Sequence, residues 1–125
     1  MGTIQGIEMA TLKLYDWNKC TTCRDYRLWL KEEGVEFDQR DFFKEPFTEK
    51  ELRKLVGKRP LANVFSWNSP SFKELGVTRE ELSADEPRMM KLMLQEPRLI
   101  RRPMVQVGRR LVIGSKKEDL KAALK

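Results

Sequence analysis

The most constraining feature of this sequence is a pair of cysteines, Cys20 and Cys23, separated by two threonines. The pair follows a strand-like run, residues 11–15, in which leucines alternate with a lysine. Because apolar residues then recur at helical spacing, we predict a helix over residues 21–33. Any fold for this chain must therefore place two thiols on the loop that joins a strand to a helix.

The residues that follow predict a strand–helix–strand unit. Gly34 stands where the C-terminal glycine cap of a helix belongs. Residues 35–42 alternate between apolar and polar, which indicates a second strand. The connection between the two strands is long enough for a parallel pair.

The middle third of the chain is predicted to be helical. Thr48-Glu-Lys-Glu51 and Thr78-Arg-Glu-Glu81 are capping boxes, in which the threonine and the glutamate each cap a free backbone N–H. Residues 86–95 carry a methionine-rich stripe at helical spacing, which we interpret as core.

The last third completes the element order. Residues 104–107 and 111–113 are predicted to form a β-hairpin, and Ser115-Lys-Lys-Glu118 is a further capping box before a terminal helix. The order is β-α-β, then helices, then β-β-α, which favours an α/β fold with a thioredoxin-like mixed sheet and a central helical insertion. We expect residues 1–10 to be a flexible extension and residues 11–125 to form a single domain.

The two cysteines differ in their expected roles. Cys20 lies at a helix N-terminus, where free backbone N–H groups and the helix dipole stabilise a thiolate. Lys19 and Arg24 add positive charge nearby. Cys23, one turn along the helix, is placed to attack a mixed disulfide formed at Cys20. We therefore expect Cys20 to be the nucleophile and Cys23 the resolving thiol.

The residues alone leave three alternatives for the cysteine pair. The cysteines could be inert core residues, half of a zinc site shared between molecules, or a structural disulfide. A Cys-x-x-Cys motif at a strand–helix junction favours a thioredoxin-like redox site over these.

Composition excludes several kinds of chemistry. The chain has no histidine, which excludes Ser-His-Asp catalysis and His-ligated metals. Its two cysteines are too few for a four-thiolate zinc site. We expect no bound metal or cofactor.

The net charge of +6 fits either a solvated surface or an acidic partner, and without a long basic block we expect no direct contact with nucleic acid. Neither a signal peptide nor a membrane-spanning run is visible, so we expect a cytoplasmic protein that contacts no membrane. We also expect it to be a monomer.

A second candidate site element is the pair Arg102-Pro103 before the third predicted strand. Thioredoxin-like folds are similar to one another in placing a cis-proline there, facing the cysteine loop. If Pro103 has that role, Arg102 would direct its guanidinium at the thiolate or at a bound oxyanion. The alternative is that Arg101 and Arg102 are solvent-facing charges.

Taken together, these motifs resemble the family that joins ArsC (arsenate reductase) proteins to the Spx-type redox regulators. The resemblance covers residues 11–124 and implies a thioredoxin-like fold with a helical insertion. It rests on the following segments: Cys20-Thr-Thr-Cys23 with Arg24, Trp29-Leu30, Phe72-Lys-Glu-Leu-Gly76, Glu96-Pro-Arg-Leu-Ile-Arg-Arg-Pro103 and Arg110-Leu-Val-Ile-Gly114.

The resemblance implies roles for individual residues. The family's nucleophilic cysteine matches Cys20, and its arginine before the cis-proline matches Arg102. Two further arginines of arsenate reductases fall near Ser66 and Ile113, neither of which is basic here. Cys23 matches the Spx-like branch, in which the pair is a reversible disulfide switch and the protein contacts the C-terminal domain of the RNA polymerase α-subunit.

We therefore expect a thiol–disulfide redox protein that uses a Cys20/Cys23 couple. Its expected partners are thioredoxin or glutaredoxin, with glutathione as a reducing co-substrate. The first alternative is an Spx-like redox-sensing transcriptional regulator that binds the polymerase α-subunit. The second is a glutaredoxin-dependent arsenate reductase, which ranks last because the two further arginines are missing.

Overall fold

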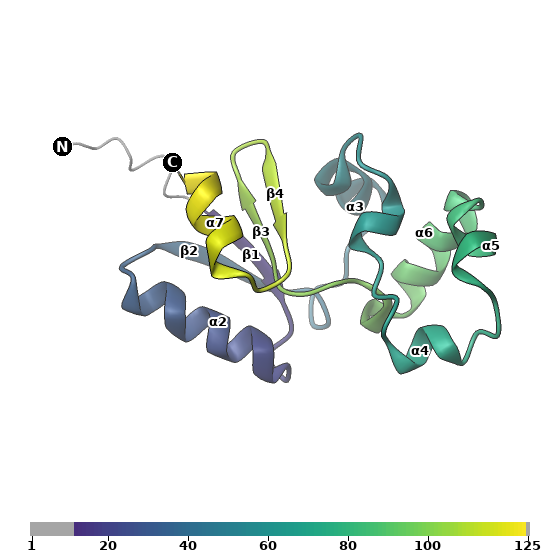
Figure 1. Ribbon diagram of the computed structural model, residues 1–125, viewed down its shortest axis with the longest axis horizontal. Helices are drawn as coiled ribbons and strands as arrows, with labels where there is room; N and C mark the ends of the chain where they lie inside the picture. Colours follow the sequence, from purple (N-terminus) through teal and green to yellow (C-terminus); the bar gives the residue numbers. More distant parts are fainter. Residues whose placement is uncertain (1–11, 125) are drawn as a thin grey trace. The chain divides into compact units, whose positions relative to one another are not determined.

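The structure is a computed structural model that describes residues 12–124, and the predicted extension over residues 1–10 lies outside this range. The chain divides into two compact units (Figure 1). Of the described residues, 12–45 together with 102–124 form the first unit, and Pro46–Arg101 form the second.

The first unit is built on a four-stranded mixed sheet. Its strand order is β2-β1-β3-β4. The predicted parallel pair is present between β1 and β2, and β3 pairs antiparallel with both β1 and β4. The strands are β1 (Leu12–Asp16), β2 (Phe37–Asp41), β3 (Met104–Val107) and β4 (Arg110–Ile113).

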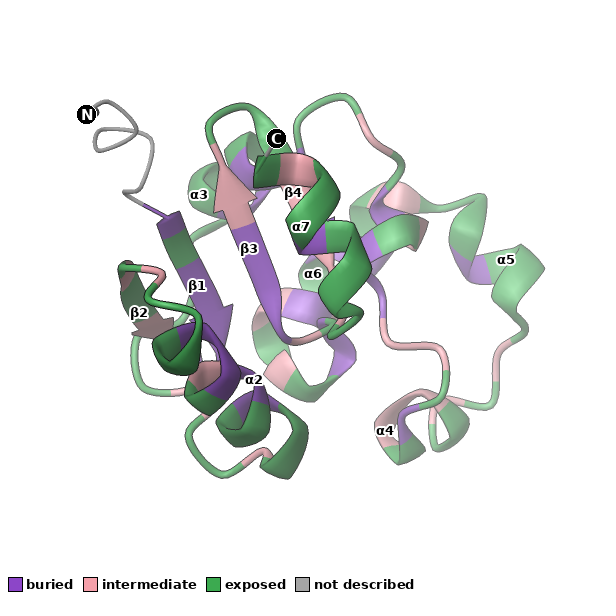
Figure 2. Ribbon diagram, turned by 60° about the vertical axis from the view of Figure 1, so that its left-hand side comes forward, coloured by how far each residue is buried: buried purple, intermediate pink, exposed green. Residues whose placement is uncertain are grey.

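Two helices cover one face of this sheet. Leu14 lies opposite Val105, which in turn lies opposite Val112, so these side chains share a face. Helix α2 (Thr21–Glu32) and helix α7 (Lys117–Leu124) pack on that face, and Figure 2 shows buried residues along β1, β3 and the inner side of α2. The helices contribute Tyr26, Trp29, Leu30 and Leu120 to the core. Full burial of each leucine stabilises the fold by roughly 1.5–3 kcal/mol.

The start of α7 differs from the prediction. The helix begins at Lys117, so Lys116, and not Ser115, precedes its first residue. The backbone N–H of Gly114 donates to the carbonyl of Pro103 at 2.8 Å, and the backbone N–H of Asp119 donates to the carbonyl of Lys116 at 3.2 Å. The chain is thus held to the sheet as far as Gly114, and the helix starts only after this connection.

The second unit is helical, as the sequence indicated. Both predicted capping boxes are present, at the starts of α3 and α5. The glycine after α3, Gly57, has a φ of +65°, a conformation that favours glycine. The elements are α3 (Glu49–Val56), η1 (Leu61–Val64), α4 (Pro70–Lys73), α5 (Arg79–Ser83), α6 (Glu86–Gln95) and η2 (Pro97–Leu99).

The methionine stripe of α6 forms part of the core of this second unit. Met89, Met90 and Met93 are all buried. An antiparallel bridge joins Phe65, directly after η1, to Ile100, directly after η2. Among residues 12–124, no helix is long and apolar enough to cross a membrane.

Candidate dithiol site

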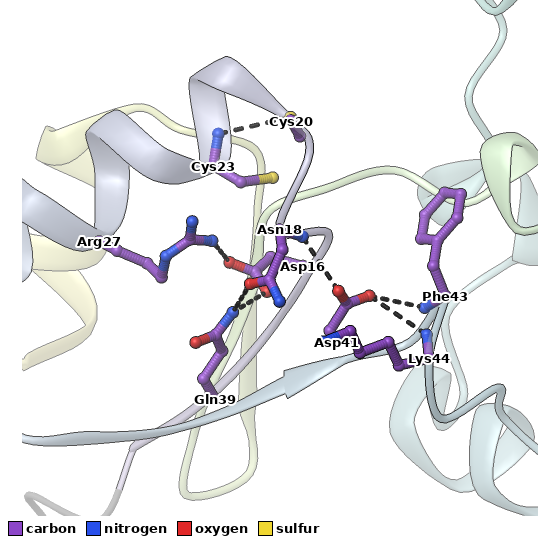
Figure 3. Close-up of polar contacts among 9 residues, drawn as sticks. All are labelled: Asp16, Asn18, Cys20, Cys23, Arg27, Gln39, Asp41, Phe43 and Lys44. Atoms are coloured by element: carbon purple, nitrogen blue, oxygen red, sulfur yellow. Dashed lines mark hydrogen bonds and ion pairs between the residues drawn. The ribbon is translucent and has the colours of Figure 1, made fainter.

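Cys20 is the N-cap residue of α2. Its backbone is extended, and its sulfur accepts a hydrogen bond from the backbone N–H of Cys23 at 3.4 Å (Figure 3). The sulfur therefore does what a capping oxygen usually does at a helix N-terminus. Cys20 is partly exposed, so an external reactant can reach it.

Cys23 lies one turn further along α2 and is fully buried. Both cysteines are free thiols in this structure. Burial raises the pKa of Cys23 from its ordinary value of 9.0 to about 12, with a further contribution from its hydrogen bond with Cys20. The site thus pairs an accessible sulfur with a protected one, which is the division of roles that the sequence predicted.

A buried carboxylate lies beneath this pair, at the end of β1. Asp16 forms an ion pair with Arg27 of α2 and accepts a hydrogen bond from Gln39 Nε2 at 2.9 Å (Figure 3). Burial raises the pKa of Asp16, and the hydrogen bonds from Gln39 and Arg27 partly offset this effect. Sequence reasoning missed this group, although alternation from Leu12 and Leu14 places Asp16 on the covered face of the sheet.

A second carboxylate, at the end of β2, fastens the cysteine loop. Asp41 Oδ2 accepts a hydrogen bond from the backbone N–H of Asn18 at 3.1 Å. Its Oδ1 accepts from the backbone N–H groups of Phe43 at 2.9 Å and Lys44 at 3.4 Å. Gln39 Nε2 also donates to Asn18 Oδ1 at 2.8 Å. The loop before Cys20 is therefore held from the neighbouring strand.

The peptide bond between Arg102 and Pro103 is cis, as predicted. The guanidinium carbon of Arg102 lies 5.6 Å from the ring centre of Trp17 and 5.4 Å from that of Phe43. These two rings stack on each other with their centres 4.2 Å apart. Arg102 thus lies against an aromatic pair that sequence reasoning missed, and its orientation toward Cys20 stays a prediction.

The two cations predicted to lie near the thiols, Lys19 and Arg24, are both exposed, one on either side of the cysteine pair in sequence. Their contribution to the site stays a prediction about local charge. Within residues 12–124, no group of three or more His, Cys, Asp or Glu side chains could hold a metal ion.

A mixed sheet with two helices on one face, a thiol pair at the first strand–helix junction and a cis-proline before the third strand define a thioredoxin-like α/β protein. Within that class, the chain belongs to the ArsC family, whose sequence model matches residues 15–123.

Its relatives include bacterial regulators. The chain is 32% identical to the regulatory protein MgsR of Bacillus subtilis over 105 residues, 82% of each chain. It is 30% identical to the global transcriptional regulator Spx of Enterococcus faecalis over 115 residues, 90% of this chain and 86% of the relative. An arsenate reductase from Vibrio cholerae shares the fold, with a TM-score of 0.73 and 20% identity over 89% of this chain and 96% of the other.

Proposed function

We propose that this protein is a thiol–disulfide redox protein whose Cys20 and Cys23 cycle between a dithiol and a disulfide. The observation that carries this proposal is the capping geometry, in which the partly exposed Cys20 sulfur accepts from the Cys23 backbone while the Cys23 thiol is buried behind it. Membership of the ArsC family supports the same chemistry.

The proposed reaction is an exchange with a disulfide of a partner. The Cys20 thiolate attacks one partner sulfur, the partner S–S bond breaks, and the first partner thiolate leaves with the electron pair. Cys23 then loses its proton and attacks the Cys20 sulfur, which releases the second partner thiolate. The protein is oxidised by two electrons and the partner is reduced by two. Thioredoxin, or glutaredoxin with glutathione, would reverse the reaction in a reducing cytoplasm.

A thiol count tests this proposal. The reduced protein should lose both free thiols after treatment with a mild disulfide oxidant and regain both after incubation with thioredoxin and its reductase. In Cys23→Ser, Cys20 should instead stop at a stable mixed disulfide. If the wild-type protein keeps both thiols under oxidant, or forms a disulfide only between molecules, the proposal is wrong.

A second candidate function is a redox-responsive regulator of transcription. The observation that favours it is that relatives covering most of the chain are named as regulators. On this proposal the surface that changes with the dithiol state binds the C-terminal domain of the RNA polymerase α-subunit.

Binding measurements separate the two candidates. The purified α-subunit domain should bind this protein with a different affinity in the oxidised and reduced states, and Cys20→Ser should bind as the reduced form does under both conditions. If the protein binds the α-subunit domain in neither state, the regulatory proposal is wrong and the thiol–disulfide proposal is unaffected.

A further inference from the structure

Asp16, Arg27 and Gln39 form a polar cluster beneath the cysteines, and the hydrogen bonds of Cys20 itself do not involve this cluster. Cys20 is fixed by its own capping bond and by its backbone N–H, which donates to the carbonyl of Trp17 at 3.1 Å. Asp16 nevertheless takes a carboxylate out of water completely, which is costly without a partner. Packing alone does not account for a charged group in this place.

The position of this cluster relates it to Cys23. Arg27, the ion-pair partner of Asp16, lies four residues after Cys23 on α2 and so shares its helix face. The Cys23 thiol also interacts with the backbone of Trp17, the residue directly after Asp16. Figure 3 shows Cys23 and the Asp16–Arg27 pair on the same side of α2, beneath the cysteine loop.

The charges that face the Cys23 thiol can be named. From the N-terminus of α2 comes Cys20, and from β1 comes Asp16, which is itself paired with Arg27. The negative charge of Asp16 disfavours ionisation of Cys23, in addition to the effect of burial. Asp41, from β2, acts on Asp16 itself by raising its pKa. The partners Arg27 and Gln39 favour the charged form of Asp16, against the cost of its burial.

We propose that Asp16, through its charged pair with Arg27 on the Cys23 face of α2, is a positioning residue that sets how readily the disulfide closes. This inference rests on the proposed thiol–disulfide function. Asp16 acts on the second step, in which Cys23 loses a proton to solvent, its sulfur bonds to Cys20, and the partner thiolate leaves with the electron pair. Its charge lowers the fraction of Cys23 that is ionised and so slows this second step.

The reaction with the aromatic disulfide DTNB separates the two steps. The first thionitrobenzoate is released when Cys20 attacks, and the second when Cys23 displaces it from Cys20. In Asp16→Asn the second release should be faster. If the pKa of Cys23 falls by about one unit, its thiolate fraction rises about tenfold, while its weaker nucleophilicity cancels about threefold, which leaves about a threefold gain.

A direct titration gives an independent reading. In a Cys20→Ser background, Cys23 is the single thiol, and its ultraviolet thiolate absorbance reports its ionisation without any exchange reaction. Adding Asp16→Asn should move this titration to lower pH. Asp16→Thr is a second uncharged variant, with a residue that suits a strand, in case the asparagine variant does not fold. Asp38→Asn, an exposed residue of β2, is the control for losing one negative charge.

The outcomes are distinct. Failure of the wild type to release two thionitrobenzoates per chain would overturn the proposed function, whereas the Cys23 titration would still test the role of Asp16. If both Asp16 variants titrate and react as Asp38→Asn does, Asp16 has no such role. A slower second release in the Asp16 variants would also overturn the inference, because it would mean that Asp16 assists the loss of the Cys23 proton.

Discussion

Arg102 and Trp17 lie against each other, with the guanidinium carbon 5.6 Å from the centre of the indole ring. One residue precedes the cis-proline and the other follows β1, so the antiparallel pairing of β1 with β3 brings them together. Phe43 completes this arrangement from the loop after β2. The cation and the two rings form an aromatic clamp, which we define as Trp17, Phe43 and Arg102.

The aromatic clamp should contribute to the stability of the first unit. Trp17→Ala removes both the stack with Phe43 and the contact with Arg102, and we expect a loss of about 1–3 kcal/mol in the free energy of unfolding. Urea unfolding followed by circular dichroism measures this. Trp17→Phe should lose less than half as much free energy of unfolding as Trp17→Ala, because it keeps a ring in the stack. Equal destabilisation by both variants would show that the stack itself contributes nothing.

The difference in burial between the two sulfurs should appear in alkylation. Native reduced protein treated with iodoacetamide should be labelled at Cys20, while Cys23, which is fully buried, should react only after unfolding in denaturant. Peptide mass spectrometry of the labelled protein identifies the site. Labelling of both cysteines at similar rates in the native state would contradict the burial of Cys23.

Stability should fall at alkaline pH because of Cys23. Its pKa is raised from 9.0 to about 12, so the folded state keeps a proton that the unfolded state loses. The resulting stabilisation is fully present below pH 9 and is lost as the pH rises from 9 toward about 12. Tyr26, whose pKa burial raises from 10.0 to about 12, adds a similar loss that starts one unit higher.

Cys23→Ala separates these two effects. Under reducing conditions, the variant should lose the part of the pH dependence that begins near pH 9 and keep the part that begins near pH 10. Denaturant unfolding at a series of alkaline pH values measures the slope. An unchanged slope in the variant would mean that Cys23 ionises equally in the folded and unfolded states.

Arsenate should be a poor substrate. The two positions at which the family resemblance would place further arginines hold Ser66 and Ile113, and one cation is a weak trap for a doubly charged anion. In an assay coupled to glutaredoxin, glutathione and NADPH consumption, arsenate should give a rate close to that of Cys20→Ser. Robust turnover that depends on Cys20 would contradict this expectation.

Local patterns in the sequence predicted much of the fold. Thr48 and Thr78 form their capping boxes because each needs only a glutamate three residues later, and the parallel pair of β1 and β2 follows from a short helical crossover. The start of α7 differs from the prediction by one residue. The hydrogen bond between Gly114 and Pro103, which ties the preceding turn to the sheet, joins segments that no local pattern connects.

The candidate site divides in the same way. The Cys20 cap and the cis bond at Pro103 could be predicted, because each depends on neighbouring residues or on the family motif. The contacts of Asp16 with Arg27 and Gln39 could not, because they join β1, α2 and β2 and depend on the register of the parallel strands. Polar pairing under a helix is a property of the tertiary structure.

Asp41 accepts backbone hydrogen bonds from both the cysteine loop and the turn after β2. A single carboxylate therefore serves as a common anchor for the amides of Asn18, Phe43 and Lys44. Opening either loop leaves part of the same buried carboxylate without its donors, and this cost couples the two loops. Their amides should accordingly exchange with solvent as one cooperative group, and the rim of the dithiol site should open as a single body.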